Sequence, residues 1–491
     1  MFSLDYLTGL FTQGAAKFSR LYPHDKWSPG KKLKILLAGY GGARNTGGDA
    51  RIHCIAHLCQ HLLGPENIEL GVLTLNKKNV QEYFDPSIHI IEFDSLFFKD
   101  ILKAASHYHM ALLSDGALFT SKFANALTLF FCEVAGVMKK QKKPCLAFGC
   151  DAGAMDGFVK KIVHQLCPET YFLARTEPSL KIATQLGLKG SLGTDPAWIL
   201  HPSSPEWAHQ EIRSKGSWEG QAPLLALLVT NPFCWPIRPS LTKLIASLVT
   251  GNKKHHYKKW YFYNDDPQGD IRFQKYLEAV AHAANNFAGQ TGAQVILTGM
   301  EERDDPVCQK FSEMIASPVA FFSPRDYNAH QISGLLQAAS VCLTSDYHAG
   351  LFSMTGGVPS IAISIDERLD YLFEESHRSE YNINASDPKL QEKLTSTLEK
   401  LWTHRGEERE KILKTLPSHL KRLAHMGSCL RKNIAQFFPG LPLPPEPPHW
   451  TGYLPPLSDS EKLRGAKGPL TELGDLEAPE VRKAPSQSSG T

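Results

Sequence analysis

Apolar positions along this chain fall into short continuous runs that alternate with longer stretches at helical spacing. The run at 35–38 is short and wholly apolar, which is typical of a strand buried on both faces of a parallel sheet. A glycine-rich turn follows this run, and an amphipathic helix follows the turn. The apolar stripe of that helix consists of Ile52, Ile55, Ala56, Cys59, Leu62 and Leu63.

The same alternation of strand and helix continues and predicts a first domain over residues 31–205. This order implies a parallel sheet with helices on both faces, an α/β fold. Its later strands are expected at 69–75, 88–93, 110–113, 144–148 and 171–174, and its later helices at 96–105, 124–140 and 178–186.

A polar, turn-rich stretch at 201–222 interrupts the pattern and predicts a linker to a second α/β domain over residues 222–438. Residues 1–30 read as an N-terminal extension, and residues 439–491 as a disordered, Pro-rich and then polar tail. In the second domain, strands are expected at 224–229, 294–298, 319–322, 341–344 and 360–364, and the last helices at 388–402 and 407–437.

Composition narrows the class of protein. A net charge of +3 argues against a nucleic-acid partner bound by a global basic field. Ten scattered cysteines without a C-x-x-C pair indicate reduced thiols and a cytoplasmic location. The chain has no signal-peptide pattern, and its longest apolar stretch, 124–138, is too short to span a bilayer. Residues 1–22 could form an amphipathic helix that touches a membrane surface or packs on the body.

The glycine-rich turn GYGGARNTGGDAR at 39–51 is a candidate anion cradle. Its glycines let a ligand approach bare backbone, and a turn that ends at a helix N-terminus offers unpaired N–H groups. The spacing matches neither G-x-G-x-x-G nor a P-loop, so a tight connection is the alternative interpretation. Polar side chains such as Arg44, Asn45 and Asp49 exceed what a simple turn needs.

Two further turns at strand ends carry candidate chemistry. His348, in TSDYHAG, is expected in the first turn of a helix, where the helix dipole disfavours a cation and suits a proton-exchanging group. The alternative is a histidine that only bridges a loop. Arg175, in RTEPS, could clamp a carboxylate or phosphate, or could pair with Glu177 or a neighbouring acid.

Several motifs in order resemble the polysaccharide pyruvyl transferase family: the glycine-rich turn, SKFANALT, AGAMD, RTEPS, GTDPAW, NPFCWP, TSDYHAG and IDERLDYL. The resemblance runs from about residue 34 to about residue 373. It implies a glycosyltransferase-B-like architecture, with two Rossmann-like parallel-sheet domains facing a cleft. It also implies transfer of a pyruvyl group from phosphoenolpyruvate to sugar hydroxyls as a cyclic ketal. No cofactor and no metal is expected; the partners are this donor and a sugar or glycan acceptor, and the oligomeric state stays open.

This chemistry gives each candidate residue an expected role. Arg44, Arg175 and the turn N–H groups would bind the donor phosphate and carboxylate. His348 would act as general acid or base, and Asp49, Asp115 or Asp195 would orient it or the sugar. Loops at the carboxyl ends of strands supply further candidate substrate-binding residues: Gly41, Gly42, Asn45, Lys122, Asn125, Asn231, Arg325 and Ser345.

The sequence departs from the family at two places. Relatives usually have a phosphate-binding arginine two positions before the histidine, whereas this chain has Asp346, which would repel a phosphate. Ser114 and Asp115 also replace the glycine- or glutamate-containing turn expected after their strand. Either Arg325 or Lys122 binds the phosphate instead, or the donor differs, or the chemistry has been lost. The alternatives to pyruvyl transfer are therefore a nucleotide-sugar glycosyltransferase and a binding protein of the same fold.

Overall fold

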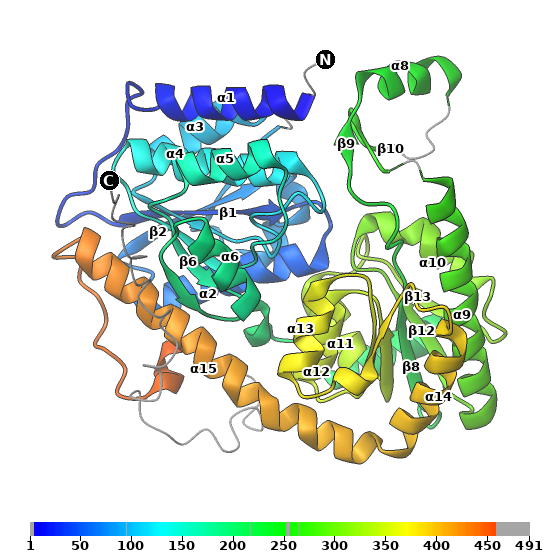
Figure 1. Cartoon of the computed structure of the whole chain (residues 1–491). Helices are drawn as coiled ribbons and strands as arrows, with labels where there is room; N and C mark the ends of the chain where they lie inside the picture. The colour runs from blue at the N-terminus through cyan, green and yellow to red at the C-terminus, as the bar shows by residue number, and fades with distance from the viewer. Residues whose placement is uncertain (1–3, 95, 217, 252–255, 265, 458–491) are drawn as a thin grey trace, which may run out of the picture.

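The computed structural model describes residues 4–94, 96–216, 218–251, 256–264 and 266–457, which form two α/β halves side by side (Figure 1). The first half is built on a seven-stranded sheet of order β3-β2-β1-β4-β5-β6-β7, in which neighbouring strands run parallel. Its strands are β1 (Leu33–Gly41), β2 (Ile68–Thr74), β3 (His89–Glu92), β4 (Met110–Leu113), β5 (Cys145–Cys150), β6 (Tyr171–Ala174) and β7 (Gly190–Leu192).

Helices cover both faces of this sheet, because its strands are apolar on both sides. On one face α3 and α5 flank α4, and α1 packs over all three; α2 lies on the other face (Figure 1). The helices of this half are α1 (Leu4–Phe18), α2 (Thr46–Leu63), α3 (Phe98–His107), α4 (Asn125–Lys140), α5 (Gly157–Leu166) and α6 (Glu177–Gln185), with the short turn η3 (Pro196–Ile199).

The second half contains a six-stranded parallel sheet of order β13-β12-β8-β14-β15-β16. Its strands are β8 (Leu224–Leu228), β12 (Gln294–Thr298), β13 (Ala320–Phe322), β14 (Val341–Thr344), β15 (Ser360–Ser364) and β16 (Asn382–Asn384). Its helices are α9 (Pro267–Thr291), α10 (Asp305–Ser312), α11 (Ala329–Gln337), α12 (Tyr347–Thr355), α13 (Glu367–Glu375) and α14 (Leu390–Thr403).

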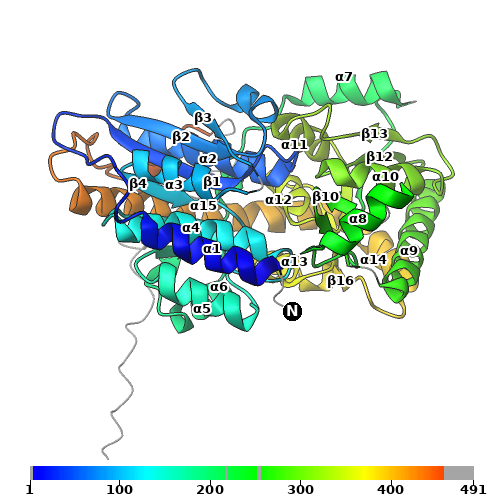
Figure 2. The ribbon, with the colours of Figure 1, turned by 90° about the horizontal axis from the view of Figure 1, so that it is seen from above.

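A small excursion lies between β8 and α9. Its antiparallel sheet has the order β10-β11-β9, with β9 at Arg238–Pro239, β10 at His256–Lys258 and β11 at Tyr261–Phe262. Helix α8 (Leu241–Thr250) follows β9 and stands apart from the body of the second half (Figures 1 and 2). Among the described residues, no helix has both the length and the apolar content needed to cross a membrane.

The predicted fold class is confirmed: the chain is an α/β protein with two parallel-sheet domains. Every strand predicted from an apolar run is present within a few residues of its expected bounds. Strands β7 and β16 were not predicted because each is three residues long and contains a single large apolar residue, Leu192 or Ile383, so neither forms an apolar run.

Two predictions at the edges of the domains are wrong. The stretch 201–222 is no plain linker, because it contains α7 (Pro205–Lys215), capped by the Ser204 hydroxyl, which accepts a hydrogen bond from the Trp207 N–H at 3.2 Å. The tail is not disordered from residue 439. Residues 439–457 follow α15, and Trp450 and Tyr453 of η6 (Trp450–Tyr453) are each only 1% exposed, so two aromatic side chains order a Pro-rich segment. Residues 458–491 lie outside the described residues.

Helix α15 (Arg405–Phe437) crosses from the second half to the first (Figure 1). Near its start, Glu408 forms a buried ion pair with Arg378 at 3.1 Å. Further along, the His419 ring stacks on Trp198 of η3 at 4.2 Å. Near its end, Arg431 donates to the Leu62 carbonyl of α2 at 2.6 Å. The helix assigned from sequence to the second domain therefore packs on both.

Candidate active site

A pocket of about 150 Å³ lies between the two sheets, among loops that follow the carboxyl ends of their strands. The first half contributes residues after β1 and β4, and the second half residues after β8, β12, β14 and β15. This is where ligands bind in open parallel sheets. The polar residues that line the pocket are Tyr40, Asn45, Arg51, Asp115, Thr230, Tyr257, Glu301, Arg303, Ser345, Asp346, His348 and Arg368.

His348 lines this pocket from the first turn of α12, as its sequence position predicts. Asp346 caps that helix by accepting a hydrogen bond from the Ala349 N–H at 3.0 Å. The imidazole lies directly against Gly47 at the start of α2, where a side chain's Cβ would fall 2.0 Å from Nδ1. The pocket therefore joins the N-terminal turns of two helices, one from each half.

Asp195 of the first half lies beside His348, at the distance of an ion pair. Its Oδ2 lies 3.5 Å from His348 Nε2, 2.5 Å from Arg51 Nη1 and 3.0 Å from Arg175 Nη1. Burial acts to raise the pKa of Asp195, but the Arg51 guanidinium outweighs it and holds that pKa well below its usual range. The carboxylate therefore stays anionic beside the imidazole.

Arg175 does not reach into the pocket. Its side chain is 1% exposed, pairs with Asp151 as well as Asp195, and lies 4.1 Å from the centre of the Tyr347 ring. The structure thus places it in a buried ion network with neighbouring acids, which is one of the two interpretations that the sequence leaves open.

Two arginines of the second half do reach the pocket. Arg303 pairs with Glu301 and lies 4.3 Å from the centre of the Trp235 ring. Arg368 binds Asp366 at 2.6 Å and lies 4.7 Å from the centre of the Phe123 ring. Both side chains keep about a fifth of their surface exposed, at 21% and 23%. They are the cations that a small anion in this pocket would meet.

The two acids predicted for the first half occupy different environments. Asp115 lines the pocket and accepts a hydrogen bond from the Ala117 N–H at 2.7 Å, and burial raises its pKa. Asp49 does not line the pocket. It accepts from the Gly42 N–H at 2.9 Å, and burial raises its pKa to about 7. Asp49 therefore fixes the glycine-rich turn, whereas Asp115 faces the space between the sheets.

The glycine-rich turn itself is only partly in the pocket. Asn45 caps α2 through a 2.7 Å bond from the Gly48 N–H and also donates to Glu301 across the cleft. Gly41 and Gly42 pack instead on β2 and the turn after it; Gly42 has φ 79°, and a Cβ there would lie 2.2 Å from Thr74 Oγ1. Arg44, with φ 55°, is not among the lining residues and accepts through its carbonyl from the Glu302 N–H.

The remaining sequence candidates lie elsewhere, with one exception. Ser345 lines the pocket, and its hydroxyl accepts from the Tyr276 hydroxyl at 3.0 Å. Lys122 pairs with Glu367 at 2.5 Å beside a neighbouring cavity, and Arg325 pairs with Glu302 and Asp305. Neither of these cations lines the His348 pocket. Asn125 donates to Asp5 and Asp156, and Asn231 accepts from the Phe233 N–H within its own loop.

Sequence reasoning missed Arg51, Arg303 and Arg368 as site residues. Arg303 and Arg368 follow the carboxyl ends of β12 and β15, so the rule that found His348 would have found them. Arg51 lies one helical turn beyond Gly47, inside the motif already singled out. Among the residues that the structure describes, no three His, Cys, Asp or Glu side chains gather as metal ligands would.

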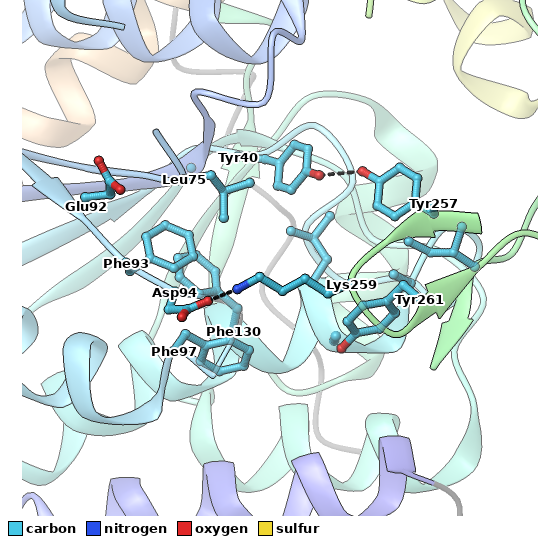
Figure 3. A pocket seen from close by; sticks show the side chains of 15 residues that line it. Tyr40, Leu75, Glu92, Phe93, Asp94, Phe97, Phe130, Tyr257, Lys259 and Tyr261 are labelled. Atoms are coloured by element: carbon cyan, nitrogen blue, oxygen red, sulfur yellow. Dashed lines mark hydrogen bonds and ion pairs between the residues drawn. The ribbon is translucent and has the colours of Figure 1, made fainter. Parts of the chain in front are cut away.

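A larger, mostly apolar chamber of about 510 Å³ adjoins this pocket. The two cavities share Tyr40, Leu127 and Tyr257 among their lining residues. Figure 3 shows Phe93, Phe97 and Phe130 on one side of the chamber and Tyr257 and Tyr261 on the other. Hydrogen-bonded hydroxyls of Tyr40 and Tyr257 bridge it, as does the ion pair of Asp94 with Lys259.

Comparisons with solved structures return remote likenesses. The Anabaena protein HepE in complex with UDP-glucose is 11% identical, with 82% of this chain and 100% of that chain covered and a TM-score of 0.49. UDP-GlcNAc 2-epimerase from Neisseria meningitidis is 9% identical, with coverages of 77% and 94% and a TM-score of 0.48. A family 9 glycosyl transferase from Veillonella parvula is 10% identical, with coverages of 77% and 100% and a TM-score of 0.40.

The comparison with protein families is more specific. No curated protein matches the chain. The sequence model described as polysaccharide pyruvyl transferase matches residues 45–367, from the cap of α2 to the start of α13. This span covers most of both sheets and every residue named above as lining the pocket, except Tyr40 and Arg368. The chain belongs to the polysaccharide pyruvyl transferase family, a family of transferases.

Proposed function

We propose that the protein transfers the pyruvyl group of phosphoenolpyruvate to two hydroxyls of a sugar, forming a cyclic ketal in the pocket between the sheets. One observation carries the proposal: His348, the start of α2 and two partly exposed arginines line the same pocket in a member of this family. A donor with a phosphate and a carboxylate needs cations and N–H groups of this kind.

The reaction defines what the side chains must do. The enol carbon C3 gains a proton, a sugar hydroxyl oxygen attacks C2, and the C2–O bond to phosphate breaks. A second hydroxyl then closes the ketal. Of the two hydroxyl protons, one replaces the proton given to C3 and the other leaves with phosphate. His348 is the group that moves these protons, and Asp195 Oδ2 lies 3.5 Å from its Nε2.

The donor phosphate must be bound by other residues than the arginine inferred to bind it in relatives. Asp346 takes the place of their phosphate-binding arginine and is committed to capping α12. Arg303 and Arg368 line the same pocket and each keep about a fifth of their own surface exposed, so in our proposal they bind the phosphate and carboxylate. Arg325 and Lys122, the substitutes suggested by sequence, lie outside this pocket.

The test is a transfer assay with a matched pair of variants. Purified protein is incubated with phosphoenolpyruvate or a nucleotide sugar and a panel of sugars, and phosphate, nucleotide and acceptor mass are measured. We expect phosphate release with a pyruvyl mass gain, lowered about 10²–10⁴-fold by His348→Asn. His282→Asn, at an exposed position of α9, should leave the rate unchanged. Nucleotide release, or an unaffected His348→Asn variant, would contradict the proposal.

A further inference from the structure

Helix α8 exposes an apolar stripe instead of burying it. Leu241, Leu244, Ile245, Leu248 and Val249 recur at i, i+3, i+4, i+7 and i+8, the spacing of a face that ordinarily packs on a core. No residue of this helix is buried, and Leu248 and Val249 are 75% and 81% exposed. The stripe is therefore built as a contact surface that nothing in the described chain covers.

Helix α1 also exposes its large apolar side chains, although its other face packs on the body of the protein. Its inner face consists of small or polar residues, including Gly9, Thr12 and Ala16. A Cβ on Gly9 would lie 2.6 Å from Ile162 Cδ1, so α1 docks closely on α5 through backbone. The large side chains point outward instead, with Phe11 61% exposed. The outward apolar residues are Tyr6, Leu7, Leu10, Phe11 and Phe18.

The two helices belong to one side of the molecule. Strand β9, which leads directly into α8, contacts α1, and Arg238 Nε of β9 lies 3.9 Å from Asp5 Oδ2 of α1. In Figure 1 both helices run along the upper edge, and Figure 2 looks down on both of them. We call their exposed apolar residues together the α1–α8 face.

The sequence segments that carry the α1–α8 face contain only basic charges, and two of these bases pair with acids of neighbouring segments, Arg238 with Asp5 and Asp156 and Lys259 with Asp94. The chain has no Asp or Glu from Tyr6 to His24, where it carries Lys17 and Arg20. It has none from Trp235 to Asn264 either, where Arg238 and five lysines occur; two of these, Lys253 and Lys254, lie outside the described residues. Basic residues beside an apolar helix face, with aromatic side chains such as Phe11 and Phe18, are the pattern of helices that lie in the interface of an anionic bilayer.

We propose that the α1–α8 face docks the protein on an anionic membrane surface, with both helices lying flat among the lipid headgroups. The apolar chamber of Figure 3 lies between the strands that carry α8 and the helices on which α1 packs. Phe11 of the face also contacts Phe98, the neighbour in sequence of Phe97 in the chamber, with ring centres 5.6 Å apart. Docking would place the chamber, and the His348 pocket beside it, next to the bilayer. This inference stands whether or not the proposed function is correct.

The test is co-sedimentation of the full chain with phosphatidylcholine vesicles that contain or lack phosphatidylglycerol. We expect binding to the anionic vesicles at about 0.1 M salt, and a large loss at about 1 M salt, because salt screens the basic residues. The variant Leu248→Asp with Val249→Asp, and separately Phe11→Asp, should each lower the bound-to-free ratio about tenfold or more. These side chains are exposed, so the unfolding midpoint should stay unchanged.

Phe437→Asp is the matched control, because Phe437 is 47% exposed at the end of α15, away from the α1–α8 face. It should bind the vesicles as the wild type does. Wild-type protein that stays in the supernatant with anionic vesicles, or binds neutral vesicles equally well, would overturn the proposal. So would a dimer in light scattering that the α8 variant dissociates, since the face would then belong to a second copy of the chain.

Discussion

The two halves of the candidate site hold their arginines in opposite ways. In the first half, Arg51 and Arg175 are each 1% exposed and share Asp195, which is fully buried. In the second half, Arg303 and Arg368 keep a fifth of their surface in contact with solvent, and Glu301, the partner of Arg303, does so too. The first half therefore holds a closed ion network, whereas the second half contains one pair, Arg303 with Glu301, in which both partners are partly exposed; Asp366, the partner of Arg368, is 2% exposed.

This difference in burial suggests different roles for the arginines of the two halves. Separating buried ions leaves an uncompensated charge at a cost of several kcal/mol, which a small ligand cannot repay. A partly exposed pair is worth about 1 kcal/mol or less, so an incoming anion can replace the acid of such a pair. The first half is therefore suited to fixing His348, and the second half to exchanging partners with a ligand.

The largest expected effect comes from breaking the closed network. Arg175→Ala leaves Asp151 and Asp195 without a shared cation, so we expect the free energy of unfolding to fall by about 3–5 kcal/mol. Chemical denaturation followed by circular dichroism measures this change. A loss of less than about 1 kcal/mol would show that the buried acids do not depend on Arg175 for charge compensation.

The next effect tests the contact between the halves. Gly47→Ala places a Cβ 2.0 Å from His348 Nδ1, so the imidazole must move, and we expect the transfer rate to fall about 10²-fold. Gly157→Ala, at the start of α5 with nothing within 4 Å of the added Cβ, serves as control and should retain the wild-type rate. Equal rates for both variants would remove the positioning role of the α2 turn.

A smaller effect depends on pH. The folded protein holds a proton on Asp49 up to about pH 7, whereas the unfolded chain releases it near the ordinary pKa of 3.8. Stability should therefore fall as pH rises between these two values and level off above about 7. We expect Asp49→Asn to remove this fall, about 2 kcal/mol between pH 5 and pH 8. Parallel denaturation curves at four pH values measure it; identical pH profiles of the two proteins would contradict it.

The smallest effect concerns the open side. Arg303→Ala breaks a pair in which both partners are 21% exposed, so we expect a loss of less than about 1 kcal/mol in the free energy of unfolding. The same denaturation series used for Arg175→Ala measures it. If the two variants lost equal stability, the two sides of the site would not differ as proposed.

Much of the fold followed from the sequence because its strands are buried on both faces. Runs such as 35–38 and 110–113 are continuous and apolar, and the structure has β1 and β4 there. The rule that ligands bind at strand carboxyl ends also brought His348 and Asn45 to one pocket, although they lie far apart in sequence. Local pattern and sheet topology were enough for these features.

The ion partners could not be predicted in the same way. Arg175 is paired with Asp151 and Asp195, and Lys122 with Glu367 across the halves, through side-chain contacts that no period in the sequence encodes. The tail shows the same limit. Its proline content predicted disorder, but two aromatic side chains, Trp450 and Tyr453, are buried in a segment that packs on α15, a contact between elements that no local pattern encodes.

Helix α15 has a mechanical consequence. The chain passes between the halves twice, once through the segment before α7 and once along α15, so the halves are joined at two places. Two chain connections allow one half to rotate relative to the other about the line that joins the connections. They oppose movements that would pull the halves apart. Pro417, inside α15, removes one hydrogen bond of that helix and marks where it would flex. A rotation about this axis would change the width of the pocket, because residues of both halves line it.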